Sequence, residues 1–148
     1  MTFNDHAVLP QFHEILAKTK KVNWKFHVTG TFRYPVKDPF AVEHCVLKYL
    51  SKVAQVANEP VKTLEWFLRV EEHESTNLHA HLLIGSFKLI EPSTNVAALE
   101  LRLARFWEWG ICSVTDVSDS TLRYVCKPGL PHFLYSKRVR KIARQQSS

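Results

Sequence analysis

The sequence predicts an α+β fold in which one antiparallel sheet carries two long helices on a single face. Two observations support this class. Stretches of alternating apolar and polar residues, typical of half-buried strands, are interspersed with stretches in which apolar residues recur at helical spacing. Their order is strand, helix, strand, strand, helix, strand, which is the order of a ferredoxin-like or RRM-like domain. We expect the sheet face opposite the helices to stay available for a ligand.

The first strand and the first long helix have clear signals. The strand is expected within residues 23–33, where apolar and polar residues alternate. Its polar side carries Lys25, His27, Thr29, Thr31 and Arg33. The helix is expected over residues 40–58, with Asp38 as its N-cap and Pro39 at the first helical position. A short helix over residues 11–21 is expected to precede them.

The second and third strands are expected to form a hairpin. Residues 63–72 and 78–87 both read as strands, and a polar turn separates them. On the second strand, alternation directs Trp66, Leu68 and Val70 to the helices. The opposite face of that strand then carries Phe67, Arg69 and Glu71.

The remaining elements complete the pattern. A second long helix is expected from the cap Asn95 to just before Gly110. A fourth strand follows over residues 111–117. A short helix over residues 120–127 is expected to start at Ser118 or Asp119 and to stop at Pro128.

Composition indicates a folded protein and mildly favours a polyanionic partner. The 148 residues are 45% hydrophobic and suit one domain over 1–148, with its core at about 22–140. We find no apolar run long enough to span a membrane and no signal peptide. Three widely spaced cysteines fit reduced thiols in the cytoplasm. The net charge of +6 mildly favours nucleic acid.

The C-terminal residues 137–148 form a basic tail. The tail includes Arg138 and Arg140. Such a run is either a solvated surface segment or an arm that contacts phosphates.

The third strand carries two histidines, His79 and His81. Residues two apart in a strand point to the same face, so both imidazoles lie beside each other. With Glu71 from the neighbouring strand, they form a donor set that suits Mn²⁺ or Mg²⁺ and could take Zn²⁺. Glu72 stays a candidate ligand if the strand end bulges, whereas His73 fits the turn. The competing interpretation is two ordinary histidines on a half-exposed strand.

Tyr124 and Lys127 form a second candidate pair. They are three residues apart in the short helix and therefore share a helical face. A lysine beside a tyrosine can hold phosphate and lower the pKa of the phenol, which makes the tyrosine a candidate nucleophile. The alternative is a core tyrosine beside a surface lysine.

Three stretches together resemble the HUH endonucleases, specifically the replication initiator (Rep) proteins of small plasmids and single-stranded DNA viruses. FHVTGTFR resembles the first motif of that family, LHAHLLI its metal motif, and YVCK its Y-x-x-K nucleophile motif. PHFLYSKRV is similar to a stretch that follows the tyrosine helix in plasmid initiators. The resemblance covers roughly residues 22–140, and the motifs occur in the family order.

The resemblance implies a metal-dependent DNA nicking and joining enzyme. A Mn²⁺ or Mg²⁺ ion held by His79, His81 and Glu71 would polarise the scissile phosphate. Tyr124 would attack it, with Lys127 assisting, to give a 5′-phosphotyrosine link and a free 3′-OH for rolling-circle replication. The substrate is then single-stranded DNA or an origin hairpin, with a host helicase as a further partner unless the chain is a separate nuclease domain. The residues expected to contact DNA are Lys25, His27, Thr29, Thr31, Arg33, Arg69, Arg138 and Arg140.

Other function classes share parts of this pattern. Single-strand transposases and relaxases carry the same metal motif, but relaxases tend to have an N-terminal tyrosine, and no tyrosine precedes Tyr34 here. A non-catalytic RRM-like module would stack bases on exposed aromatics of the sheet, for which Phe67 is the candidate. The metallo-β-lactamase pattern fails, because apolar residues follow His81.

Overall fold

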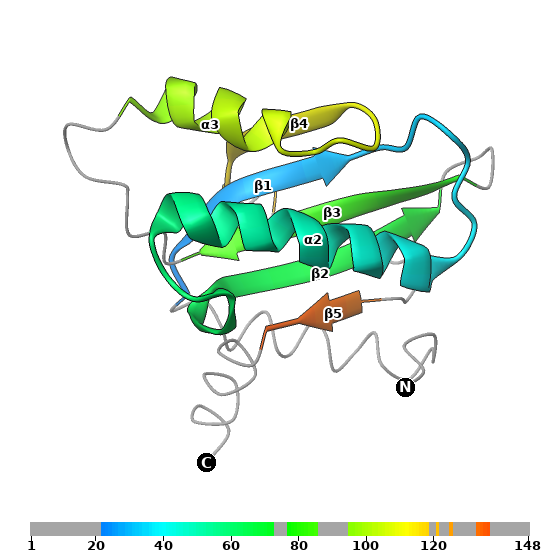
Figure 1. Cartoon of the computed structure of the whole chain (residues 1–148), viewed down its shortest axis with the longest axis horizontal. Coiled ribbons are helices and arrows are strands. Elements are labelled where there is room, and N and C mark those ends of the chain that lie inside the picture. Colours follow the sequence, from blue (N-terminus) through cyan, green and yellow to red (C-terminus); the bar gives the residue numbers. More distant parts are fainter. Residues whose placement is uncertain are drawn as a thin grey trace, which may run out of the picture.

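The structure is a computed structural model, and it describes residues 22–72, 77–85, 95–118, 121, 125 and 133–136. In this part of the chain, strands form an antiparallel sheet in the order β4-β1-β3-β2-β5 (Figure 1). The elements are β1 (Trp24–Gly30), α2 (Pro39–Ala57), the 3₁₀ helix η2 (Val61–Thr63), β2 (Glu65–Glu72), β3 (Leu78–Gly85), α3 (Val96–Arg105), β4 (Cys112–Asp116) and β5 (Phe133–Tyr135).

The element order confirms the α+β class and is consistent with a ferredoxin-like arrangement. The crossovers through α2 and α3 interleave the strands, so that β3 lies between β1 and β2, and β4 lies on the far side of β1. The expected hairpin of β2 and β3 is antiparallel, with Glu71 opposite His79. Strand β5 was not predicted. It is three residues long, and only its pairing with β2 defines it.

Capping residues set both ends of helix α2. The Asp38 side chain accepts a hydrogen bond from the Phe40 N–H at 3.0 Å, as an N-cap does. Asn58 ends the helix in the left-handed region, with φ of 53°. The Tyr49 hydroxyl, fully buried between the helices, donates to the Leu103 carbonyl of α3 at 3.0 Å.

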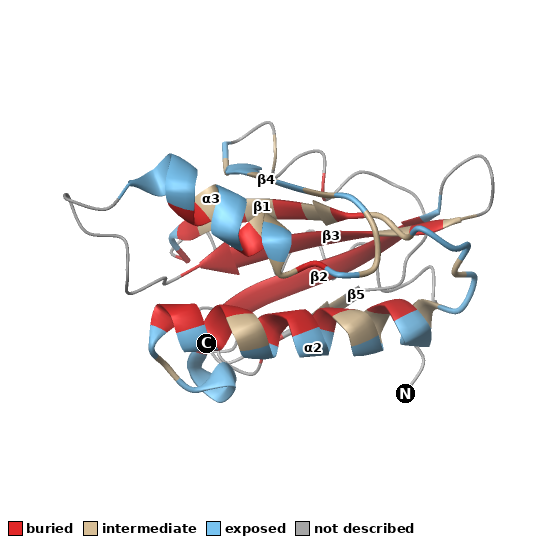
Figure 2. Cartoon of the chain, turned by 45° about the horizontal axis from the view of Figure 1, so that its top comes forward, coloured by how far each residue is buried: buried red, intermediate tan, exposed pale blue. Residues whose placement is uncertain are grey.

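One face of the sheet, here called the helix face, packs against α2 and α3. Figure 2 shows both helices on this side, each with its buried residues turned towards the strands. The predicted alternation is confirmed, because Trp66, Leu68 and Val70 all belong to the core cluster. The other inward-facing strand residues of that cluster are Phe26, Val28, Leu78, Ala80, Leu82 and Ile84.

Helix α3 is shorter than the periodicity predicted, because tertiary contacts take over after Arg105. Asn95 caps the helix as expected, accepting from the Ala98 N–H at 3.2 Å. The Trp107 indole packs against Gly30, where a Cβ atom would lie only 2.5 Å from the ring. Its Nε1 also donates to the Thr31 carbonyl at 2.8 Å. These contacts draw the end of the predicted helix onto the end of β1.

The opposite face is not open along its whole width, which corrects the sequence-based expectation. We call it the histidine face and define it by His27, Arg69, Glu71, His79 and His81. Along β2 and β3 it is covered: Phe67 and Leu83 are 0% exposed and Arg69 is 2% exposed. Towards the other edge of the sheet, the residues of β1 and β4 that lie on the histidine face are half-buried to exposed.

Several predictions lie outside the described residues. These are the helix over 11–21, the turn containing His73, most of the helix over 120–127, and the basic tail over 137–148. In the described part of the chain, no helix is both long enough and apolar enough to cross a membrane.

Candidate functional site

The strand register brings the three predicted metal ligands to one place on the histidine face. Glu71 of β2 lies directly opposite His79 of β3, and Arg69 lies opposite His81. Residues directly opposite each other in an antiparallel pair have Cβ atoms about 5 Å apart. On the other side of β3, Thr29 of β1 lies opposite His81. The backbone thus agrees with the predicted grouping of Glu71, His79 and His81.

The side chains on this face form a chain of contacts that we call the His–Glu chain: His27, His81 and Glu71. The His27 Nε2 atom lies 3.2 Å from His81 Nδ1, and the two rings are stacked with an interplanar angle of 20°. The other ring nitrogen of His81, Nε2, lies 3.6 Å from Glu71 Oε1. The His–Glu chain therefore crosses three neighbouring strands, β1, β3 and β2.

Burial keeps both imidazoles neutral at pH 7. It lowers the pKa of His81 to about 4, although the Glu71 carboxylate acts in the opposite direction. Burial lowers the pKa of His27 as well. A neutral His81 carries one N–H, and the tautomer that satisfies both contacts directs it at Glu71. His81 Nδ1 is then an acceptor, and His27 Nε2–H donates to it.

Neutral imidazoles beside a carboxylate are chemically suited to a divalent metal ion, because metals bind the unprotonated ring nitrogen. Among the residues that the structure describes, however, no group of three or more His, Cys, Asp or Glu side chains is arranged to hold an ion. His79 is half-buried on the same face, and Glu72 is exposed at the end of β2. The ligand set of His79, His81 and Glu71 therefore stays a prediction.

Arg69 connects the histidine face to the segment that contains the predicted nucleophile. Its guanidinium donates from Nη1 to the carbonyl oxygen of Val125 at 2.5 Å, and Val125 is 1% exposed. Before it, the Ser118 hydroxyl accepts a hydrogen bond from the Thr121 N–H at 3.3 Å, which is the contact expected of an N-cap at Ser118. Tyr124 and Lys127 themselves lie outside the described residues.

The residues predicted to contact DNA fall into different environments. Lys25 and Thr29 are half-buried on β1, whereas Arg33 is exposed beyond the strand end. Thr31 also lies beyond β1, and its hydroxyl donates to the Ile111 carbonyl at 3.1 Å. Arg69 is buried rather than exposed as a phosphate-contacting side chain would be. Arg138 and Arg140 lie outside the described residues.

Sequence reasoning missed the pairing of His27 with His81. It placed His27 among the DNA contacts, whereas the structure makes it a direct neighbour of the histidine motif. A usable signal was present, because β1 and β3 are adjacent in a ferredoxin-like sheet and both residues occupy the face opposite the helices. The register, with His27 opposite Leu83, then makes the two histidines diagonal neighbours.

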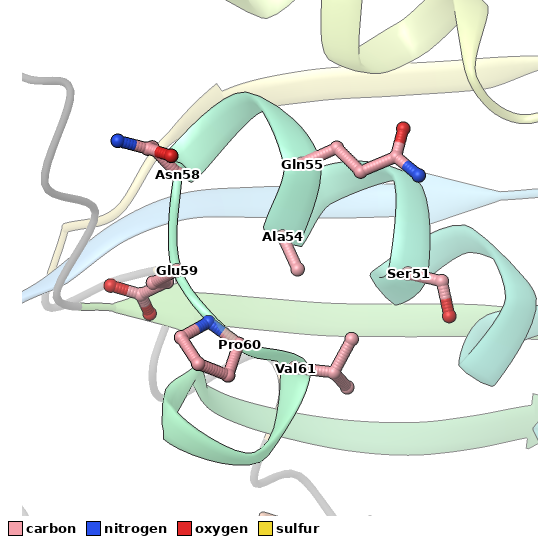
Figure 3. Close-up of a pocket in the computed structure, with 7 residues that line it drawn as sticks. All are labelled: Ser51, Ala54, Gln55, Asn58, Glu59, Pro60 and Val61. Atoms are coloured by element: carbon pink, nitrogen blue, oxygen red, sulfur yellow. The ribbon is translucent and has the colours of Figure 1, made fainter.

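A separate hollow lies on the helix side of the molecule. It is open, and it is lined by the last turns of α2 and the start of η2, including Gln55, Asn58 and Val61 (Figure 3). No predicted site residue lines it. The histidine face is therefore the better candidate for a functional site.

Comparison with known proteins adds no family assignment. No protein-family model matches the chain, and no curated protein matches its sequence.

Proposed function

We propose that the protein is a metal-dependent endonuclease and strand transferase that acts on single-stranded DNA through Tyr124. The chemistry comes from the resemblance to HUH initiators. The observation that carries the proposal is the hydrogen bond from Arg69 to the Val125 carbonyl. It holds Val125, the residue that follows Tyr124 in the sequence, against the face that carries His81 and Glu71. This contact supports a single site formed by the nucleophile motif and the histidine motif.

The metal would be held by His79, His81 and Glu71. Support comes from the register that places Glu71 opposite His79, and from the burial that keeps His81 neutral. Two imidazoles and one carboxylate leave positions for water or phosphate oxygens on Mn²⁺ or Mg²⁺. The ion would supply positive charge beside the scissile phosphate.

The reaction needs a nucleophile, a leaving group and a proton balance. The Tyr124 oxygen attacks phosphorus and loses its proton, the bond from phosphorus to the 3′ oxygen breaks, and that oxygen gains a proton. The products are a 5′-phosphotyrosine link and a free 3′-OH, which can prime rolling-circle replication of a plasmid or viral origin. Lys127 would stabilise the developing charge. We place this activity in the cytoplasm of the host.

A non-catalytic, RRM-like binding module is less well supported. Such modules stack unpaired bases on exposed aromatic rings of the sheet. Phe67, the candidate for that role, is 0% exposed. The histidine face instead gathers buried imidazole, carboxylate and guanidinium groups, which base stacking does not require.

The test is a covalent-adduct assay with labelled single-stranded DNA and Mn²⁺ on a denaturing gel. The wild-type protein should retain label, and a chelator should abolish it. Tyr124→Phe should bind DNA normally but form no adduct and release no 3′-OH, because it lacks the attacking oxygen. Lys127→Ala should slow the same step less severely. Tyr135→Phe is the matched control, and an adduct mapped to Tyr135 would refute the assignment of the nucleophile.

A further inference from the structure

A buried arginine, Arg69, contacts the segment that carries the predicted nucleophile, and we propose that Arg69 is a positioning residue for Tyr124. Its hydrogen bond to the Val125 carbonyl would fix the backbone of that segment beside His81. The inference rests on the proposed function for the identity of the nucleophile. It goes further, because it gives a role in the reaction to a residue that the sequence predicted as a DNA contact.

Arg69 lies between the two predicted motifs. On β2 it is directly opposite His81 of β3 and, on its other side, opposite Phe133 of β5. Burial is the main cause that lowers the pKa of His81, and the nearby charge of Arg69 acts in the same direction. The Arg69 Nη1 atom also donates to the Val125 carbonyl at 2.5 Å. One side chain therefore connects the histidine motif to the nucleophile motif.

The burial of Arg69 makes a purely structural role costly. Arg69 is 2% exposed and Val125 is 1% exposed, so their hydrogen bond lies away from water. Removing a guanidinium from water costs free energy, and apolar residues of similar volume are often as stabilising or more so. The surroundings would accept such a residue, because Phe67 and Leu83 on the same face are 0% exposed. The contact with the Val125 carbonyl therefore explains Arg69 better than packing does.

A guanidinium is well suited to hold a backbone group in one place. It is planar, always charged and donates from a rigid arrangement of nitrogens, whereas the ammonium of lysine is a compact charge on a flexible stem. A hydrogen bond from a charged donor is also stronger than one between neutral groups. The bond therefore fixes the Val125 carbonyl relative to β2, the strand that also carries Glu71.

The carbonyl held by Arg69 is close to the nucleophile along the chain. Val125 directly follows Tyr124, and consecutive Cα atoms lie about 3.8 Å apart. Lys127 comes two residues after Val125. A displacement of Val125 would therefore displace the backbone of both residues, and an error of about 1 Å in the position of a reacting group can slow a reaction about 100-fold. Arg69 would act through this backbone and not on the reacting atoms.

The first test separates the rate of adduct formation from DNA binding and from stability. Arg69→Met removes the donors, and it should slow adduct formation at saturating single-stranded DNA by about 100-fold. Its affinity for the DNA should be unchanged, because Arg69 is buried. Arg69→Lys should recover about tenfold of the lost rate, because it restores a charged donor without the rigid geometry. Rates are expressed per folded molecule, with the folded fraction taken from circular dichroism.

Leu68→Ala is the matched control, since Leu68 is the adjacent residue on β2 and is fully buried on the helix face. It should lower stability and leave the rate per folded molecule unchanged. A wild-type rate in folded Arg69→Met would overturn the inference. If Arg69→Met does not fold, a wild-type rate in Arg69→Lys would overturn it instead. An equal loss of rate in Leu68→Ala would also overturn it, because lower stability alone would then explain the effect.

Hydrogen exchange tests the contact without nicking. Peptides that contain Val125 should exchange faster in the Arg69 variants than in wild type, whereas peptides from α2 should exchange at the same rate. Unchanged exchange at Val125 would overturn the inference. If wild type forms no adduct but exchange at Val125 is faster in the variants, the proposed function fails and the contact with Arg69 stands. If wild type forms the adduct and the Arg69 variants match its rate, only the role of Arg69 is refuted.

Discussion

The two faces of the sheet are buried to a similar degree at their centre, but by different kinds of side chain. On the helix face, Leu68 and Leu82 are surrounded by other apolar residues. On the histidine face, Phe67 and Leu83 are equally buried, but so are Arg69 and His81. Burying imidazole and guanidinium groups costs free energy that apolar residues of similar volume would not. The buried apolar side chains, most of which lie on the helix face, therefore account for stability, and we propose that the polar set on the histidine face is kept for its chemistry.

The largest expected effect is on activity and comes from the histidine face. Replacing both His79 and His81 by Ala should abolish Mn²⁺-dependent nicking, because the donor set loses both imidazoles. Circular dichroism should show that the fold is retained, since neither residue belongs to the core cluster. Nicking would be measured on labelled single-stranded DNA. Full activity in this double variant would rule out the metal site.

The next effect is on stability and comes from the helix face. Leu68→Ala should lower the free energy of unfolding by about 2–5 kcal/mol, because it removes buried methyl groups and leaves a cavity. The matched change on the histidine face is Thr29→Ala, which should cost less than about 1 kcal/mol, the worth of one neutral hydrogen bond. Urea denaturation gives both values. Similar decreases in the free energy of unfolding in the two variants would contradict the larger contribution of the helix face to stability.

A smaller effect should be a dependence of stability on pH, which arises from His81 on the histidine face. The pKa of His81 is about 4 in the folded protein, against 6.5 for an ordinary histidine, so the unfolded chain binds the proton more tightly. The free energy of unfolding should therefore be highest above pH 6.5 and should fall by at most about 3 kcal/mol as the pH drops towards 4. Denaturation at several pH values would measure it. His81→Leu should flatten the profile, and an unchanged profile would contradict a buried neutral imidazole.

The smallest effect concerns non-specific DNA affinity. Deleting residues 137–148 should weaken binding of single-stranded DNA and reduce the slope of log K against log salt by about 0.7 for each phosphate that the tail neutralises in the intact protein. Fluorescence anisotropy over a range of salt concentrations would measure both. An unchanged affinity and slope would show that the basic tail is a solvated segment, and Arg33→Ala would then test the exposed loop after β1 in the same way.

Local chemistry in the sequence determined the elements and the faces of the strands. Asp38 and Asn95 cap their helices as predicted, because a short polar side chain satisfies an N–H group at the helix start whatever surrounds it. The alternation in β1 and β2 assigned the core residues, because strand geometry turns successive side chains to opposite faces. These properties depend on a few residues that are close together in the sequence, so they can be predicted from the sequence alone.

Only the tertiary structure decided what covers each face and which polar groups meet. Strand β5 exists through its pairing with β2, and α3 stops early because Trp107 packs against Gly30. The burial of Arg69 and the contact of His27 with His81 depend on strand register and on distant segments. Such contacts join residues more than 50 positions apart, and local periodicity carries no information about them.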